Sequence, residues 1–283
     1  MGKSTNILWA GRKLTDGTIE KGYSWNPWIG CQKVSEGCRN CYAETMAKRY
    51  GWVKEWGKDY RRTSEANWKK PIQWARQAVK DGVVRRVFCA SLADVFDPNV
   101  PQEWREDLWD LIRSTAFIEE TEIHSFGLEW LILTKRPENI RKMLPLEWQD
   151  YPPYYIRMGV TAENQEMADK RILILLGSWS GKNFLSYEPA IGPLDLWGAK
   201  YDNPNGGKTG AITSWPGMIQ WLICGAESGP AARPMDIEWA RSVRDQCVAA
   251  NVPFFLKQMV VDGKLNVLPE LDGKVWDQFP KDD

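Results

Sequence analysis

The sequence has little of what secreted, membrane-spanning or strongly charged proteins need. No stretch approaches the roughly 18 continuous apolar residues of a membrane span, and no apolar signal core follows the first six residues. Basic and acidic residues both number 37, so the formal net charge is zero. A general electrostatic attraction to nucleic acid is therefore not indicated, although a local basic patch stays open. We expect a cytoplasmic protein without membrane association, in which thiols stay reduced.

The chain does contain enough apolar residues for a packed core. They make up 43% of its 283 residues, which suits either one large α/β domain or two small ones. The sequence has neither an internal repeat nor a low-complexity linker. We therefore predict a single domain over 1–283, with insertions at 51–80 and 196–215 and a C-terminal cap at 259–283.

Short apolar runs recur along the chain and predict strands. They do not alternate with polar residues, which is typical of strands buried on both faces, as in parallel sheets. The runs cover 24–30, 86–91, 129–134, 155–160, 183–187, 219–225 and 252–256. Helical patterns between them cover 102–114, 164–176 and 237–250. This alternation favours a βα barrel or an open doubly wound sheet.

Polar residues follow most of these runs. In βα barrels the active site lies at the carboxyl ends of the strands, so we interpret these positions as the edge of a functional site. The alternative is a solvated rim of ion pairs and helix caps. The residues concerned are Asp94, Thr134, Lys135, Arg136, Glu163, Glu188, Glu227, Lys257 and Gln258.

Three cysteines lie close together after the first predicted strand. Cys31, Cys38 and Cys41 have the spacing C-x6-C-x2-C. Three thiolates on one loop can bind three irons of a cubane iron–sulfur cluster and leave the fourth iron without a protein ligand. We predict such a cluster here.

The alternative for the same cysteines is a zinc site. Structural zinc takes four ligands, and the chain has no second C-x2-C pair and one histidine, the distant His124. Cys89, Cys224 or Cys247 would have to supply the fourth ligand. These three cysteines lie in apolar strands or on a helix, and we expect them to be core residues.

The tryptophans and lysines of the 51–80 insertion have two interpretations. Trp52, Trp56 and Trp68 can stack a base while neighbouring lysines hold its backbone. Alternatively, the segment is a packed lid with solvated lysines.

These motifs together resemble a known family. The cysteine segment continues as Gly37-Cys38-Arg39-Asn40-Cys41-Tyr42-Ala43-Glu44, and the likeness extends over 25–27, 30–31, 91–96, 133–137, 159–164, 186–189, 225–230, 232–235 and 254–258. The chain resembles the radical S-adenosylmethionine (SAM) superfamily. Within it, the chain is similar to a phage-associated three-cysteine-motif family of uncharacterised proteins. The usual superfamily spacing is C-x3-C-x2-C, so the longer first gap is a departure.

The resemblance implies a fold and a set of site residues. The fold would be a partial (βα)6-7 TIM-like barrel of the radical SAM type. The three cysteines would hold a catalytic [4Fe–4S] cluster, and SAM would chelate its open iron. SAM would be bound by Tyr42, Asp94, Thr134, Lys135, Glu163, Glu188, Gly225 and Glu227. Substrate would meet Arg136, Arg233, Lys257 and Gln258.

The resemblance also implies an activity. An electron donor of the flavodoxin or ferredoxin type would reduce the cluster, which would cleave SAM to a 5′-deoxyadenosyl radical. The enzyme would then modify or isomerise a substituent of a nucleobase or nucleotide, for example in phage thymidine hypermodification in DNA. A peptide or small-metabolite substrate, and a non-enzymatic zinc or nucleic-acid-binding module, stay open as alternatives.

Overall fold

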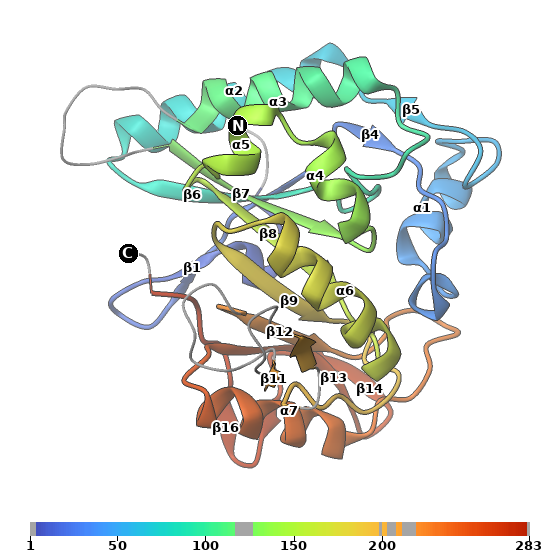
Figure 1. Ribbon diagram of the computed structural model, residues 1–283, viewed down its shortest axis with the longest axis vertical. Helices are drawn as coiled ribbons and strands as arrows, with labels where there is room; N and C mark the ends of the chain where they lie inside the picture. The colour runs from blue at the N-terminus through green and yellow to red at the C-terminus, as the bar shows by residue number, and fades with distance from the viewer. Residues whose placement is uncertain (1–3, 117–126, 198–199, 203–207, 211–218, 282–283) are drawn as a thin grey trace. The chain divides into compact units, whose positions relative to one another are not determined.

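The polypeptide divides into two compact units, each assembled from three separate stretches of the chain. The computed structural model describes residues 4–116, 127–197, 200–202, 208–210 and 219–281 (Figure 1). The first unit comprises Met1–Lys33, Ala43–Leu133 and Met143–Arg157, and the second comprises Val34–Tyr42, Thr134–Lys142 and Met158–Asp283. Most of the expected 196–215 insertion lies outside the described residues, and so does His124.

Three parallel strands form the sheet of the first unit. They are β3 (Tyr23–Trp25), β6 (Val84–Cys89) and β7 (Gly127–Thr134), in the order β7-β6-β3. The central residues Val87, Cys89 and Trp130 have no solvent exposure, as the non-alternating apolar runs predict. The expected first strand is shorter than predicted, because the chain turns out of β3 and forms a separate ribbon with β5.

Two long helices cover this sheet. Helices α2 (Glu65–Lys80) and α3 (Gln102–Ala116) lie side by side, and α2 packs against β6 (Figure 1). In α3, Leu108 and Ile112 are four residues apart and fully buried, which is the spacing of one helical face. The remaining elements are η1 (Leu8–Ala10), β1 (Arg12–Lys13), β2 (Ile19–Glu20), β4 (Trp28–Ile29), α1 (Tyr42–Tyr50), β5 (Arg61–Arg62) and α5 (Leu146–Asp150).

A buried ion network crosses the first unit. Glu129 on β7 lies opposite Arg86 on β6 in the strand register, and Arg86 Nε donates to Glu129 Oε2 at 2.6 Å. Arg157 Nε lies 3.3 Å from the other carboxylate oxygen. All three side chains are at most 5% exposed. One buried carboxylate therefore contacts two nearly buried guanidinium groups.

The main sheet of the second unit has, in its described residues, four parallel strands and one antiparallel edge strand. Its strands are β8 (Ile156–Thr161), β9 (Asn183–Tyr187), β12 (Leu222–Gly225), β13 (Phe254–Val261) and β14 (Lys264–Val267), in the order β14-β13-β12-β9-β8. Helix α6 (Gln165–Ser178) connects β8 to β9, and α7 (Ile237–Ala249) precedes β13 and packs against it. The other elements are η2 (Glu36–Cys38), η3 (Pro137–Asn139), α4 (Ile140–Met143), β10 (Lys200–Asp202), β11 (Lys208–Gly210), β15 (Glu270–Leu271) and β16 (Lys274–Val275).

The expected partial (βα)6-7 TIM-like barrel is wrong. The structure is a mixed α/β fold with eight mostly parallel strands, three in the first unit and five in the second. The described residues contain seven α-helices, and two of them, α4 and α5, have four and five residues. Between β9 and β12, the described positions carry the antiparallel pair β10–β11 and no helix. The regular strand–helix repeat of a barrel is therefore missing.

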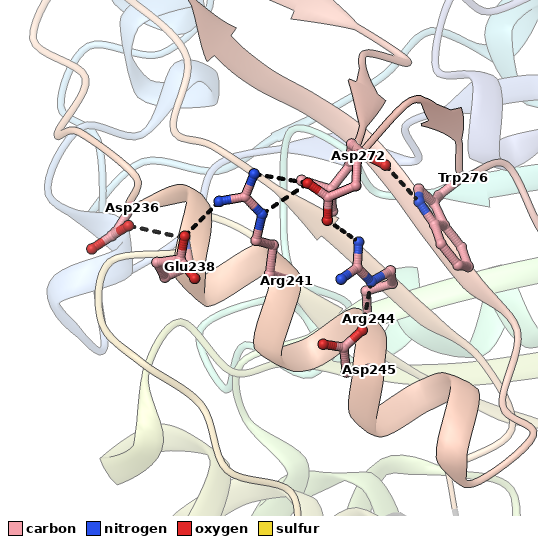
Figure 2. Close-up of polar contacts among 8 residues, drawn as sticks. Asp236, Glu238, Arg241, Arg244, Asp245, Asp272 and Trp276 are labelled. Carbon is pink, nitrogen blue, oxygen red and sulfur yellow. Dashed lines mark hydrogen bonds and ion pairs between the residues drawn. The ribbon is translucent and has the colours of Figure 1, made fainter.

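The C-terminal cap consists of antiparallel strands tied to α7. Strand β14 extends the sheet beside β13, and β15 and β16 form a hairpin whose turn includes Asp272 at φ 55°. Figure 2 shows Arg241 and Arg244 of α7 directed at the Asp272 carboxylate, with N–O distances of 2.6 to 2.9 Å. Asp236 caps α7 by accepting from the backbone N–H of Glu238 at 2.9 Å.

Among the helices that the structure describes, none is long and apolar enough to cross a membrane.

Candidate functional site

The carboxyl ends of the parallel strands in the second unit carry most of the predicted site residues. Parallel strands end at the same edge of a sheet, and open α/β sheets bind ligands there. We call the residues at this edge the strand-end cluster: Glu163, Glu188, Gly225, Glu227, Lys257 and Gln258. Lys257 and Gln258 lie in the middle of β13, where its parallel pairing with β12 ends. All six were predicted from the sequence.

A β-bulge positions Lys257 in this cluster. Cys224 of β12 pairs with Leu256 of β13, but Gly225 pairs with Gln258, so Lys257 is the extra residue on β13. Bulges redirect a side chain and are common beside active sites. Lys257 Nζ donates a short hydrogen bond to Glu188 Oε1, and the two side chains are 24% and 19% exposed.

Gly225 leaves the space beside this pair free of a side chain. A Cβ atom at this position would lie 3.4 Å from the side chains of both Gln258 and Glu188. The Gln258 amide is fixed by donating to the carbonyl of Ala226 at 2.7 Å. The result is a partly exposed Lys–Glu pair beside a bare segment of backbone.

Glu227 is the centre of a second polar group. Arg233 donates to it through Nη2 at 2.5 Å, Nε at 3.0 Å and its backbone N–H at 2.8 Å. Asn40 Nδ2 also donates to it, at 2.9 Å. Burial acts to raise the pKa of Glu227, but the hydrogen bonds from Arg233 and Asn40 outweigh it and hold the pKa below its usual value. The side chain is therefore an ionised, 5% exposed anchor.

Glu163 is fully buried and is the centre of a third group. Arg171 Nη1 donates to its Oε2 at 2.7 Å, and the backbone N–H of Gly37 donates to Oε1 at 3.2 Å. Burial acts to raise the pKa of Glu163, but the charges of Arg171 and Lys135 outweigh it and lower the pKa. A buried charge that is paired and hydrogen-bonded in this way fixes its neighbours.

The remaining predicted residues lie elsewhere in the two units. Thr134 Oγ1 accepts from the backbone N–H of Arg136 at 2.9 Å, and both residues are buried, so Thr134 shapes the turn after β7. Tyr42 is 45% exposed at the start of α1. Asp94 belongs to the first unit, where Oδ1 accepts from the backbone N–H of Phe96 at 2.9 Å.

The expected iron–sulfur cluster is wrong. Among the residues that the structure describes, no group of three or more histidine, cysteine, aspartate or glutamate side chains can hold a metal ion. Cys31 belongs to the first unit and donates to the carbonyl of Gln32 at 3.3 Å. Cys38 and Cys41 belong to the loop Val34–Tyr42 of the second unit. The same finding corrects the expected [4Fe–4S] and SAM cofactors and the expected radical SAM, iron–sulfur and metal-binding character.

The other three cysteines are core residues, as predicted. Cys89, Cys224 and Cys247 have no solvent exposure. Burial raises the pKa of each thiol, which keeps these side chains protonated and unreactive.

The tryptophan-rich segment contains a helix and packed rings. Trp68 lies on α2, where the Arg62 guanidinium covers its ring at 4.3 Å from the centroid and Trp25 contacts it edge-on at 5.3 Å. Trp52 stacks on Tyr50 at 5.0 Å. For Trp68 these contacts favour the packed-lid interpretation over base stacking.

Three residues of the site were missed by the sequence analysis. Gly37 and Asn40 lie within the cysteine segment, and their position beside the cysteines was a signal that could have identified them. Arg171 is a buried charge on α6, eight residues after Glu163. A cation on the apolar face of a helix was the signal there.

Comparisons with known proteins identify a family. No curated protein and no solved structure matches the chain. A family model described as "Protein of unknown function (DUF5131)" matches residues 17–280. The match spans nearly the whole sequence, and the chain therefore belongs to this family.

Proposed function

We propose that the chain is an enzyme that binds a nucleotide or nucleoside at the strand-end cluster of the second unit. The observation that carries this proposal is the Glu188–Lys257 pair, which the β13 bulge holds beside the bare backbone of Gly225. The bulge leaves Lys257 unpaired with β12, and its side chain contacts the Glu188 carboxylate. Bulges are common beside active sites, and open α/β sheets bind ligands at the ends of their strands, so this geometry supports a ligand here.

The mixture of charges supports a nucleotide as this ligand. Carboxylates accept hydrogen bonds from ribose hydroxyls and base amino groups, and Lys and Arg bind phosphate. Glu188, Lys257 and Arg233 are partly exposed, with side-chain exposures of 19%, 24% and 22%. Glu163 and Glu227 are more deeply buried, so we assign direct contact to the first three residues and support to the two buried glutamates.

The pair also has the groups needed for proton transfer. Lysine and glutamate side chains act as general acids and bases in many enzymes, and this pair lies where a ligand hydroxyl or amine would meet it. The radical chemistry implied by the resemblance requires a cluster that the described side chains do not form, so it is not part of this proposal.

Equilibrium binding to the full-length protein tests the proposal. The probes are nucleoside monophosphates, nucleosides, ribose 5-phosphate, inorganic phosphate and a short peptide, each measured by isothermal titration calorimetry. We expect a monophosphate to bind more tightly than its nucleoside or inorganic phosphate. Lys257→Ala and Gly225→Val should each weaken binding at least about tenfold, which corresponds to about 1.4 kcal/mol.

Gly177→Ala is the matched control for Gly225→Val. Gly177 lies on α6, and a Cβ atom added there would meet nothing within 4 Å, so its substitution should leave binding unchanged. The proposal fails if no nucleotide or nucleoside binds at millimolar concentration, or if Lys257→Ala and Gly225→Val bind as the control does. Preferential binding of the peptide would favour the alternative substrate class.

A further inference from the structure

The loop Val34–Tyr42 holds two half-buried cysteines on an anchored turn. Cys38 ends η2, where its backbone N–H donates to the carbonyl of Ser35 at 2.9 Å. Arg39 continues the turn with helical dihedral angles, φ −61° and ψ −50°. Cys41 follows two residues later and directly precedes α1. The spacing is C-x2-C, and both thiols are half-buried.

The first anchor of this loop is the buried carboxylate of Glu163. Gly37, which precedes Cys38, donates its backbone N–H to Glu163 Oε1 at 3.2 Å. A Cβ at Gly37 would lie 2.8 Å from the Glu163 carboxyl group. This approach is closer than real Cβ contacts allow, so the loop is seated where only glycine fits without a shift.

The second anchor is Glu227. Asn40, which precedes Cys41, donates through Nδ2 to Glu227 Oε2 at 2.9 Å and to the carbonyl of Ala231 at 2.7 Å. Two ionised carboxylates at the ends of β8 and β12 therefore fix the residue before each cysteine. The backbone of the turn is held in place, while both cysteines are half-buried.

This arrangement contrasts with that of the buried cysteines. Cys89, Cys224 and Cys247 have thiols whose pKa is raised by burial. Reactive thiols are partly exposed, and C-x2-C pairs are a recurrent redox motif. Cys38 and Cys41 lie on either side of the turn at Arg39 and Asn40. A disulfide needs Cβ atoms about 3.5–4.5 Å apart, so this turn must bring the two Cβ atoms to that distance for the link to close.

We propose that Cys38 and Cys41 form a redox-active dithiol whose substrate is a disulfide. One thiolate attacks a substrate sulfur, which forms a mixed disulfide and releases the first substrate thiolate. The second thiolate attacks the bonded cysteine sulfur, which closes the Cys38–Cys41 disulfide and releases the second substrate thiolate. The two protons of the dithiol pass to these products, so the chain loses two electrons and the substrate disulfide gains them. This inference does not depend on the proposed nucleotide ligand.

Redox titration of the full-length protein tests this inference. The folded protein is equilibrated with reduced and oxidised glutathione, remaining thiols are alkylated, and the products are mapped by peptide mass spectrometry. We expect a reversible Cys38–Cys41 link while Cys31 stays open to alkylation. The link should persist in Cys31→Ser, the matched control, because this residue is also a half-buried cysteine but lies outside the pair.

Variants that lack one cysteine of the pair distinguish the proposed thiol–disulfide exchange from non-specific oxidation of the thiols. Cys41→Ser should accumulate a glutathione mixed disulfide on Cys38 with release of one glutathione, and neither Cys38→Ser nor Cys41→Ser should release the second glutathione. Circular dichroism confirms that each variant is folded. The inference is overturned if both thiols stay alkylatable in excess oxidised glutathione, if Cys31 pairs with either of them, or if the link forms only in urea.

Discussion

Replacing Glu129 by alanine should destabilise the first unit strongly. Glu129 is the carboxylate between Arg86 and Arg157, and all three side chains are at most 5% exposed. Arg86 also donates to the carbonyl of Gly11 at 3.1 Å, so one hydrogen bond of this guanidinium survives the substitution. The substitution removes a carboxylate that both guanidinium groups contact.

The expected cost follows from this burial. Removing one partner of a buried ion pair costs about 3–5 kcal/mol because an uncompensated charge stays buried. An unfolding entropy of about 2.1 cal/mol/K per residue gives roughly 0.6 kcal/mol/K for this chain of 283 residues. The melting temperature should therefore fall by about 5–8 °C if the two interleaved units unfold together. If calorimetry instead resolves two unfolding transitions and one of them shifts by more than this, the two units unfold separately.

Differential scanning calorimetry measures this effect, and Glu147→Ala is its control. Glu147 pairs with Arg113 at 2.5 Å, but the two side chains are 60% and 38% exposed. An exposed pair of this kind contributes about 0–1 kcal/mol, so the control should melt within about 2 °C of the original protein. Equal melting temperatures for Glu129→Ala and Glu147→Ala would refute the reasoning, because burial would then carry no extra cost.

Three further predictions concern local contacts. Gly37→Ala should cost about 1–3 kcal/mol in urea unfolding, because its Cβ would lie 2.8 Å from the Glu163 carboxyl group. Gly177→Ala on α6 should instead stabilise by up to about 1 kcal/mol, and similar midpoints for the two variants would contradict this. The partners of Asp272 lower its pKa to about 2, so its ion pairs should stabilise the hairpin above the unfolded pKa of about 3.9 and fade as pH falls toward 2. Asp272→Asn should remove this pH dependence from hydrogen exchange in the hairpin; an unchanged profile would assign it to other groups. Asn164→Ala should cost about 1 kcal/mol by calorimetry, because the Asn164 side chain accepts from the backbone N–H three residues on at 3.0 Å, and an unaltered melting temperature would show that the cap is dispensable.

The strands of the parallel sheets could be predicted from the sequence because a strand buried on both faces appears as one continuous run of apolar residues. The apolar run 183–187 coincides with β9, and the run 129–134 lies within β7. Helix α2 was not predicted, since its buried face uses the small residues Ala75 and Ala78 beside Trp74 and gives a weak apolar period. The segment 51–80 was interpreted from its tryptophans and lysines, whose positions do not follow the helical spacing of the buried face.

At the candidate site, too, the sequence predicts only what depends on nearby residues. The glutamates at the strand ends could be found because each follows a recognisable apolar strand, and parallel strands end at one edge. The cysteine spacing indicated that the loop has a functional role, but it did not indicate which residues the loop contacts. Gly37 and Asn40 bind carboxylates 126 and 187 residues further along the chain, and no local pattern encodes partners at that separation. Gaps between cysteines do not say where three sulfur atoms lie in space.

These long separations have a consequence for synthesis on the ribosome. Asn40 donates to the carbonyl of Ala231, 191 residues later. At about 5–20 residues per second, roughly 10–40 s pass between the translation of these two positions. For nearly all of this interval the nascent chain carries Cys38 and Cys41 without the Glu227 anchor, which lies 187 residues after Asn40. Exposure of these thiols to oxidants and chaperones is therefore set by the speed of translation.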